Sequence, residues 1–243
     1  MSTIIRRDIR HPGLNVIRWK GYQEMAFDKP IHKFDDEDMK WKVLSSENII
    51  HRPHLDAYKE RVELPDGRIY DEFYHLHFSP VVCIVAETVD GSLIMERQYR
   101  HAVREVLTEI PAGIVEEGED PLTAARRELQ EETGYAGGEW TLLTVEYAQG
   151  GVQDNKMYSY YAKGVAPHGN RHLDSTEDIR VHLIDRREVL RMLINDEINQ
   201  APIVPALWNY FALHTDLLTD IIQNPPVSGA SQGPVLCRST DNV

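Results

Sequence analysis

The chain has 243 residues, of which 42% are hydrophobic and 27% are charged, an ordinary composition for a globular protein with a sizeable core. Acidic residues outnumber basic ones by 39 to 26, and the net charge of −13 argues against nucleic acid or an anionic membrane as the main partner. Two cysteines cannot build a disulfide framework, no apolar run is long enough to span a bilayer, and the N-terminal residues lack a signal-peptide pattern, so we expect a cytoplasmic protein.

The N-terminal part of the chain is polar, with an acidic run at residues 35–38, and residues 1–48 are expected to form an irregular extension. Strand-like residues follow, and turn signals at Pro65-Asp66-Gly67 and Asp90-Gly91 predict two hairpins. The predicted strands are residues 58–64, 68–77, 80–88, 92–98, 140–147, 156–165 and 179–185.

Three helices are predicted, at residues 121–133, 187–194 and 205–221. The first has Asp120 as its N-cap and Gly134 just beyond its end, and the last repeats apolar residues at helical spacing. The C-terminal residues are rich in Pro, Gly and Ser and are expected to be disordered. Strands with interleaved helices predict a layered α/β (α+β) fold.

The most informative segment is residues 113–135, which holds seven acidic residues and two arginines. Glu128, Glu131 and Glu132 share one face of the predicted helix, where each pair of like charges costs about 0.2–0.5 kcal/mol. An acidic helix face is often only a solvated surface. A divalent cation would remove the repulsion here, because carboxylates and backbone carbonyls are ligands that Mg²⁺ or Mn²⁺ prefers.

The spacing in this segment resembles the signature of the Nudix hydrolases, GX5EX7REUXEEXGU. Gly113, Glu119 and the run from Arg127 to Gly134 fill all seven fixed positions, while Tyr135 stands where the family prefers an aliphatic residue. The resemblance implies a Nudix α/β/α sandwich with a mixed sheet, preceded here by a small N-terminal β module. It also implies hydrolysis of a nucleoside diphosphate linked to another group, with Mg²⁺ as the cofactor and Mn²⁺ as a substitute.

By this resemblance, each matched acidic position has an expected role. Glu128 and Glu132 would bind the metal, and Glu131 would be a further ligand or a catalytic group. Arg127 would orient these carboxylates through paired hydrogen bonds, and Glu119 would brace the loop before the helix or reach a metal-bound water, so both are expected among the catalytic residues. The two signature glycines of residues 113–135, which we call the Nudix box, would supply backbone conformations that other residues avoid.

Residues before the box resemble those of ADP-ribose pyrophosphatases. Residues 98–100 read Gln-Tyr-Arg and residues 109–113 read Glu-Ile-Pro-Ala-Gly, as in the QYR and PAG runs of that group. In those enzymes the carbonyl at the position of Ala112 is a metal ligand, and the arginine at the position of Arg100 lies near the substrate phosphates. We therefore expect Arg100 and Glu109 to bind substrate.

An acidic loop after the box, at residues 173–182, resembles the loop that closes over the substrate in the same enzymes. Glu177 matches a loop glutamate that acts there as a metal ligand or a general base. Ser175 stands where a second acidic residue is found, so any base role is expected of Glu177 alone.

The substrate is less sharply indicated than the reaction. ADP-ribose-specific members carry a proline shortly after the box, and residues 148–154 lack it but keep Gly150 and Gly151, which we expect to bind substrate. ADP-ribose is the leading candidate, and another nucleoside diphosphate sugar such as GDP-mannose is the competitor. A ligand sensor without turnover, and a Nudix enzyme for dinucleotides or nucleoside triphosphates, are the further alternatives.

The resemblance also indicates how the chain is organised. The expected division is an extension at 1–48, a β module at 49–79, a Nudix domain at 80–222 and a tail at 223–243. The β module resembles one used for swapped dimerisation, so we expect a homodimer whose partners are nucleotide sugars and neither nucleic acid nor membrane.

Some residues invite a second interpretation. His75 and His77 would share a strand face and could hold a metal, although a surface strand is the more frequent case. Trp208, Tyr210 and Phe211 could stack on a base, but at helical spacing they are more often core residues.

Overall fold

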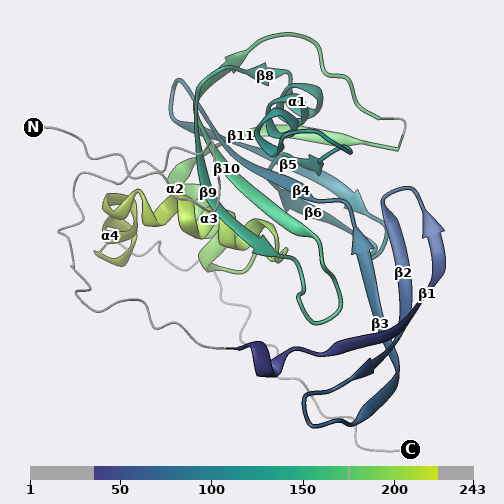
Figure 1. Ribbon diagram of the computed structural model, residues 1–243. Coiled ribbons are helices and arrows are strands. Elements are labelled where there is room, and N and C mark those ends of the chain that lie inside the picture. Colours follow the sequence, from purple (N-terminus) through teal and green to yellow (C-terminus); the bar gives the residue numbers. More distant parts are fainter. Residues whose placement is uncertain (1–35, 175, 224–243) are drawn as a thin grey trace, which may run out of the picture.

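The computed structural model describes residues 36–174 and 176–223, which form two sheets and several helices (Figure 1). The elements in chain order are η1 (Glu37–Met39), β1 (Lys42–Arg52), β2 (Leu55–Glu63), β3 (Ile69–Phe78), β4 (Val81–Thr88), β5 (Ser92–Arg100), β6 (Glu105–Glu109), β7 (Ala112–Ile114), α1 (Pro121–Thr133), β8 (Tyr135–Ala136), β9 (Glu139–Tyr147), β10 (Lys156–Pro167), β11 (Ile179–Asp185), α2 (Arg186–Ile194), α3 (Ile203–Ala212) and α4 (Thr215–Gln223). No helix in the described part of the chain is both long and apolar enough to cross a membrane.

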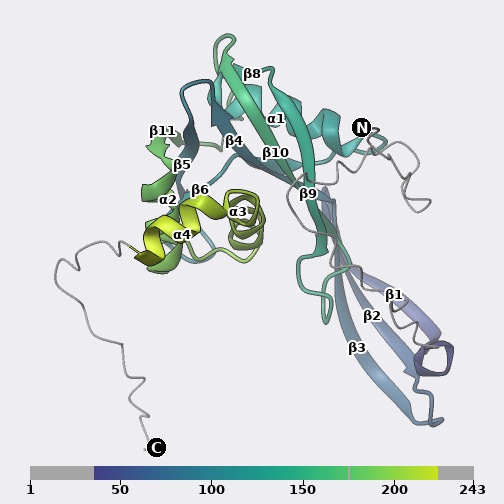
Figure 2. The same ribbon diagram turned by 90° about the vertical axis from the view of Figure 1, so that its left-hand side faces the viewer.

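The first three strands form an antiparallel sheet in the order β1-β2-β3, and Figure 2 shows this sheet projecting from the rest of the molecule as an arm. The predicted turn joins β2 to β3, with Gly67 in the left-handed region at φ 83°. The expectation of an irregular segment up to residue 48 is wrong over part of its length, because β1 begins at Lys42. Every residue of β1 is exposed, so no alternation of apolar and polar residues marks it. Residues 1–35 and the predicted tail from 224 onward lie outside the described residues.

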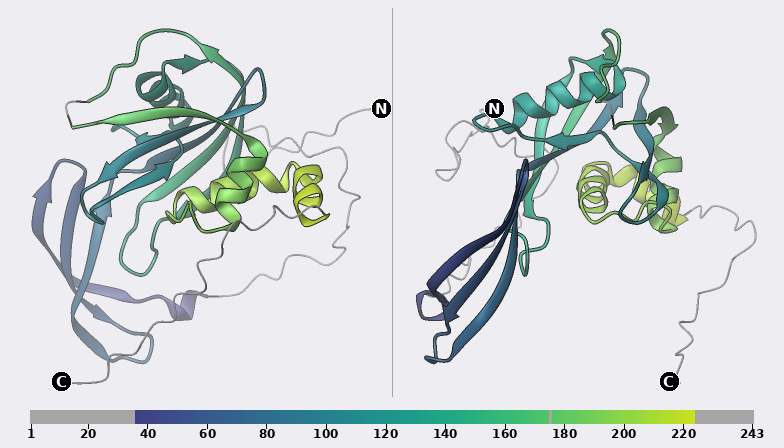
Figure 3. Two further views of the ribbon diagram at one scale, coloured as in Figure 1. Left: turned by 180° about the vertical axis from the view of Figure 1, so that it is seen from behind. Right: turned by 90° about the vertical axis from the view of Figure 1, so that its right-hand side faces the viewer.

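The larger sheet is mixed and separates two hydrophobic cores. Its order is β11-β5-β4-β10-β8, with β4 and β10 parallel and the other pairs antiparallel. Alternate residues of the buried strand β4 face opposite sides, with Val82 and Ile84 packing toward α1 and Cys83 and Val85 packing toward α2 and α3. Figure 3 shows α1 and the C-terminal helices on opposite sides of this sheet. The predicted α/β/α sandwich with a mixed sheet is confirmed.

The helix that carries the carboxylates has the predicted bounds. The side chain of Asp120 accepts hydrogen bonds from the backbone N–H groups of Leu122 and Thr123, and Gly134 ends the helix at φ 75°. The long helix predicted at residues 205–221 is wrong as a single element, because α3 ends at Ala212 and α4 begins at Thr215. The apolar stripe continues across this break, so periodicity does not reveal it.

Candidate active site

Arg127 lies at the centre of the carboxylate cluster on α1. Its Nε and Nη2 donate to the two carboxylate oxygens of Glu119 at 3.1 and 2.9 Å, and its Nη1 donates to Glu128 at 2.8 Å and to Glu131 at 3.1 Å. Nη2 also donates to the carbonyl of Ile114 at 3.0 Å. The hydrogen bonds with Glu119 raise the pKa of Arg127, and in return Arg127 lowers the pKa of Glu119. One guanidinium thus gathers three of the predicted site carboxylates.

Glu132 lies deeper than the other box carboxylates, with 3% of the residue exposed. Its carboxylate accepts a hydrogen bond of 3.0 Å from the backbone N–H of Ala112, which joins the end of α1 to β7. Burial raises the pKa of both Glu132 and Glu128. Burial therefore disfavours the charged form of each carboxyl group by more than its hydrogen-bond partner favours it.

The two box glycines are needed for different reasons. Gly134 adopts the left-handed conformation that we expected. The same expectation is wrong for Gly113, which has no positive φ. A Cβ at Gly113 would lie 2.0 Å from the carboxylate carbon of Glu128, so this glycine makes room for that side chain.

A cavity of about 590 Å³ lies beside the box. Four predicted site residues from β5, β6 and β7 line it: Arg100, Glu109, Ala112 and Gly113. The β1–β3 sheet and the following segment contribute residues such as His54 and Phe78, while Gly150 and Gly151 lie in the exposed turn between β9 and β10 and do not line it. The cavity therefore lies between the arm and the segment that leads into α3, which contributes Gln200 and Ile203.

Arg100 and Glu109 form a bidentate ion pair in this cavity. Arg100 donates from Nε at 2.8 Å and from Nη2 at 2.5 Å to Glu109, of which 2% is exposed. Hydrogen bonding to Glu109 raises the pKa of Arg100. The Arg100 side chain is 42% exposed, so its guanidinium is anchored at one edge and accessible at the other.

Glu177 lies in the loop between β10 and β11, where its carboxylate accepts a hydrogen bond of 2.9 Å from the backbone N–H of Asp174. Its negative charge contributes to the raised pKa of Glu128 and of Glu132. The loop is tied to α1 by Arg171, which donates to the carbonyls of Glu132 and Ile179 at 2.5 and 2.8 Å. The structure thus brings Glu177 to the same side of the sheet as the box, although no hydrogen bond joins it to a box carboxylate in the described part of the chain.

The donor set fits a divalent cation, because it consists of hard oxygen ligands whose buried charges lack full compensation. As they stand, no three His, Cys, Asp or Glu side chains within residues 36–174 and 176–223 are close enough to share one ion. The arrangement itself explains the separation, since Arg127 holds Glu128 while Ala112 holds Glu132. The predicted metal-binding roles of Glu128, Glu132, Glu177 and Ala112 stay predictions.

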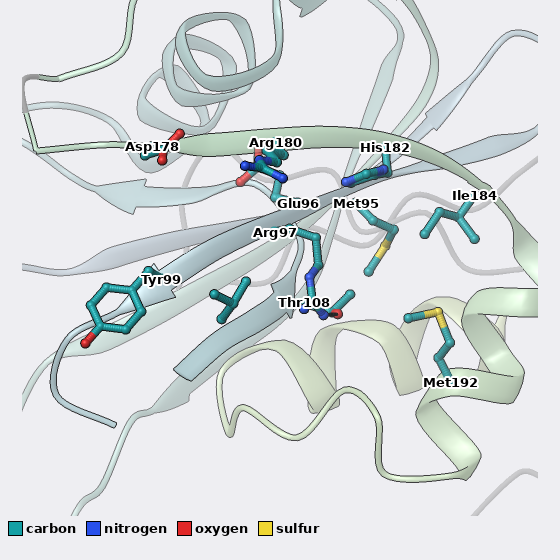
Figure 4. A pocket seen from close by; sticks show the side chains of 11 residues that line it. Met95, Glu96, Arg97, Tyr99, Thr108, Asp178, Arg180, His182, Ile184 and Met192 are labelled. Atoms are coloured by element: carbon teal, nitrogen blue, oxygen red, sulfur yellow. Dashed lines mark hydrogen bonds between the residues drawn. The ribbon is translucent and has the colours of Figure 1, made fainter. Parts of the chain in front are cut away.

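A second cavity, of about 500 Å³, lies between β5, β11 and α2 (Figure 4). It contains Arg97 of β5, which is directly opposite Arg180 of β11, and also His182. Figure 4 shows Arg97 and Thr108 on one side of β5 and Glu96 directed to the other. His182 lines this cavity and not the first one.

Several residues near the site were not predicted from the sequence. Glu96 is buried near Glu132, while Asn155 and Gln200 line the first cavity with side-chain atoms that have no hydrogen-bond partner among the described residues. Nothing in the local pattern marks them, because they come from separate elements.

The other predicted alternatives resolve as follows. His75 stacks on Tyr58 and His77 pairs with Asp154, so the two do not converge on a metal. Tyr210 and Phe211 are core residues, as the helical spacing favoured, whereas Trp208 is 40% exposed.

Comparison with known proteins places this geometry in a family. Residues 77–207 match the NUDIX domain, and residues 41–76 match the nucleoside diphosphate sugar hydrolase N-terminal domain. An ADP-ribose pyrophosphatase of Bacillus subtilis (strain 168) is 32% identical over 66% of this chain and 86% of its own length. Another, of Mycobacterium tuberculosis, is 30% identical over 78% of this chain and 95% of its own length. A solved structure described as an ADP compounds hydrolase shares the fold, with a TM-score of 0.63 at 22% identity, covering 73% of this chain and 95% of that one.

Proposed function

The chain belongs to the Nudix hydrolases, and we propose that it cleaves the diphosphate of a nucleoside diphosphate sugar, with ADP-ribose as the leading substrate and Mg²⁺ as the cofactor. In this reaction the bond between the bridging oxygen and one phosphorus breaks, and water supplies the new oxygen. ADP-ribose and water would give AMP and ribose 5-phosphate.

One observation carries the proposal: Arg127 gathers three carboxylates, and one of them, that of Glu128, lies against Gly113 in the wall of a cavity that contains an accessible arginine. The carboxylates suit a cation, and Arg100 suits a phosphate oxygen. A pyrophosphate is the substrate group that needs both. The names of the two pyrophosphatase relatives support ADP-ribose.

Different side chains of the site would bind the phosphate, position the carboxylates and accept a proton. Arg100, held by Glu109, would bind a phosphate oxygen, and Arg127 would keep Glu128 and Glu131 in fixed positions. Glu177, on its anchored loop, would accept a proton from the attacking water or complete the ligand set. A divalent cation held by Glu128, Glu132 and the Ala112 carbonyl would supply neutralisation of phosphate charge and activation of water.

A second candidate is hydrolysis of another nucleoside diphosphate sugar, such as GDP-mannose. It is favoured by the match of residues 41–76 to the N-terminal domain of nucleoside diphosphate sugar hydrolases. The missing proline in residues 148–154 points the same way.

The deciding experiment incubates the full chain with ADP-ribose, GDP-mannose, UDP-glucose and NADH, each with Mg²⁺ and with EDTA. Products are separated by anion-exchange chromatography. We expect Mg²⁺-dependent formation of AMP and ribose 5-phosphate from ADP-ribose at the highest kcat/KM. Faster cleavage of GDP-mannose would favour the second candidate, and binding without cleavage of any substrate would favour a ligand sensor.

We also propose that the chain forms a homodimer through the β1–β3 sheet. The support is the number of large apolar side chains that this sheet and its approach leave exposed: Trp41, Val43, Leu44, Ile49, Ile50, Ile69, Tyr70 and Tyr74. Apolar side chains gathered in this way favour burial against a partner.

A further inference from the structure

Glu96 of β5 is a buried carboxylate that the Nudix signature does not include. Only 2% of the residue is exposed, and its Oε1 has no hydrogen-bond partner among the described residues. A buried carboxyl oxygen without a partner is unfavourable, so such a group needs an explanation.

The surroundings of Glu96 are those of the proposed metal site. In the register of the sheet it lies directly opposite Glu109 of β6, and its strand neighbour on the same face, Ile94, packs in the core with α1. After burial, the negative charge of Glu96 has the largest effect in raising the pKa of Glu132. The side chain of Glu96 is therefore directed to the face of the sheet that carries α1, the Nudix helix (Figure 4).

The nearby cations do not satisfy Glu96. Arg171 and Arg100 are the positive groups whose charges act to lower the pKa of Glu96, against the effect of burial. Arg100 directs its Nε and Nη2 to Glu109, and Arg171 donates to the backbone carbonyls of Glu132 and Ile179. Both guanidinium groups near Glu96 thus direct these hydrogen bonds to other acceptors, and one of those acceptors is Glu109, the acidic residue directly opposite it.

Another buried carboxylate in the same sheet, on β4, has hydrogen-bond partners within the protein. Glu87, 7% exposed, accepts hydrogen bonds from Tyr161 at 2.6 Å and from Tyr210 at 2.8 Å, and Arg186 lies 3.7 Å away. The fold can therefore satisfy a buried glutamate with its own side chains. Among the described residues it leaves Oε1 of Glu96 without a partner, on the face where a cation is expected.

We propose that Glu96 is a further carboxylate ligand of the divalent cation, supplied by β5 rather than by the signature. This inference rests on the proposed use of a divalent cation. With Glu96 included, the ligands come from a strand, a helix and the short β7 segment, so the cation links β5 to the Nudix helix.

The test is Mn²⁺ binding by the full chain, measured by isothermal titration calorimetry without nucleotide. Glu96→Gln, which keeps the shape and removes the charge, should weaken Mn²⁺ binding by about 10- to 100-fold. Glu87→Gln is the matched control and should bind Mn²⁺ as the parent does. Glu96→Asp keeps the charge on a shorter side chain and should fall between the two.

A second measurement separates ligation from a structural role. In EDTA, Glu96→Gln should unfold at a temperature no lower than the parent, because it replaces a buried carboxyl group that has an unpartnered oxygen with a neutral group of the same shape. In Mn²⁺ its melting temperature should rise less than that of the parent. Equal Mn²⁺ affinity in the parent and in Glu96→Gln would overturn the inference alone, whereas a parent that binds no Mn²⁺ would overturn the proposed cofactor itself.

Discussion

Gly113 shows how a single missing methyl group can shape an active site. Its backbone is not left-handed, so another residue could adopt its conformation, but a Cβ there would lie 2.0 Å from the carboxylate carbon of Glu128. Because that carboxylate is the far end of a flexible side chain, it can move away at little cost to the fold. The position of Glu128, rather than the stability of the chain, is what the glycine protects.

We therefore expect Gly113→Ala to lower kcat by about 10- to 100-fold, the usual effect of misplacing a metal-site group, with little change in melting temperature. Steady-state kinetics and thermal unfolding check this. Gly169→Ala is the matched control, since a Cβ there meets nothing within 4 Å. Normal turnover by Gly113→Ala would show that Glu128 is not a ligand in its present position.

Arg100 combines two functions in one side chain. Its bidentate bond to the buried Glu109 fixes the guanidinium, and its exposed edge faces the cavity. Replacement by alanine would leave Glu109 without its partner, so loss of activity could reflect the fold. Lysine keeps the charge and loses the planar fork of donors.

Arg100→Lys should raise KM for ADP-ribose about tenfold, which corresponds to roughly 1.4 kcal/mol of binding, and should change kcat much less. Initial rates over a range of substrate concentrations separate the two constants. Arg191→Lys, which alters an arginine paired with Glu188 on α2, should leave both constants unchanged. An unaltered KM for Arg100→Lys would exclude a phosphate contact of the guanidinium fork.

Among the secondary-structure elements, α1 has a well-capped N-terminus. The carboxylate of Asp120 accepts from the N–H groups of Leu122 and Thr123 at 3.1 and 3.2 Å, and Pro121 needs no partner for a missing N–H. Asp120→Ala should lower the free energy of unfolding by about 1 kcal/mol, measured by urea denaturation. Asp120→Asn keeps an acceptor and should retain most of the stability. Equal losses in both variants would point to charge rather than capping.

The elements that could be predicted from sequence are those with local signals. The helix α1 has a cap, a proline and a terminal glycine, and the strand at residues 179–185 alternates clearly, so both have their predicted bounds. The short strands β6, β7 and β8 contain two to five residues and carry no periodicity. They exist because longer neighbours offer them backbone hydrogen bonds, which no local pattern reports.

The same distinction applies to the site. The box carboxylates lie on one helix at fixed spacing, so their proximity follows from helical geometry. Glu96 and Arg171 reach the site through the register of β5 and through the return of the loop after β10. Such proximity depends on which strands are neighbours, and the sequence gives no direct signal for it.

At the scale of the whole molecule, the arm has little core of its own. The three-stranded sheet projects from the Nudix domain (Figure 2). Within the described residues its edge strand β1 pairs only with β2, and it is exposed along its whole length. Exposed apolar side chains on an unpaired edge favour association with another chain. Because residues of the arm also line the larger cavity, association would alter the surroundings of the substrate.

The parent chain is therefore expected to be a dimer by size-exclusion chromatography with light scattering. Ile50→Glu should shift it toward the monomer, because Ile50 is 47% exposed in the single chain and a charge there costs little until a partner covers it. Ser46→Glu on the same strand is the control for added charge alone, and it should stay dimeric. A monomeric parent would contradict the proposed dimer, and a dimer that Ile50→Glu leaves intact would place its interface away from β1. If dimerisation completes the substrate cavity, the Ile50→Glu monomer should also show a raised KM while its melting temperature at low protein concentration matches that of the dissociated parent.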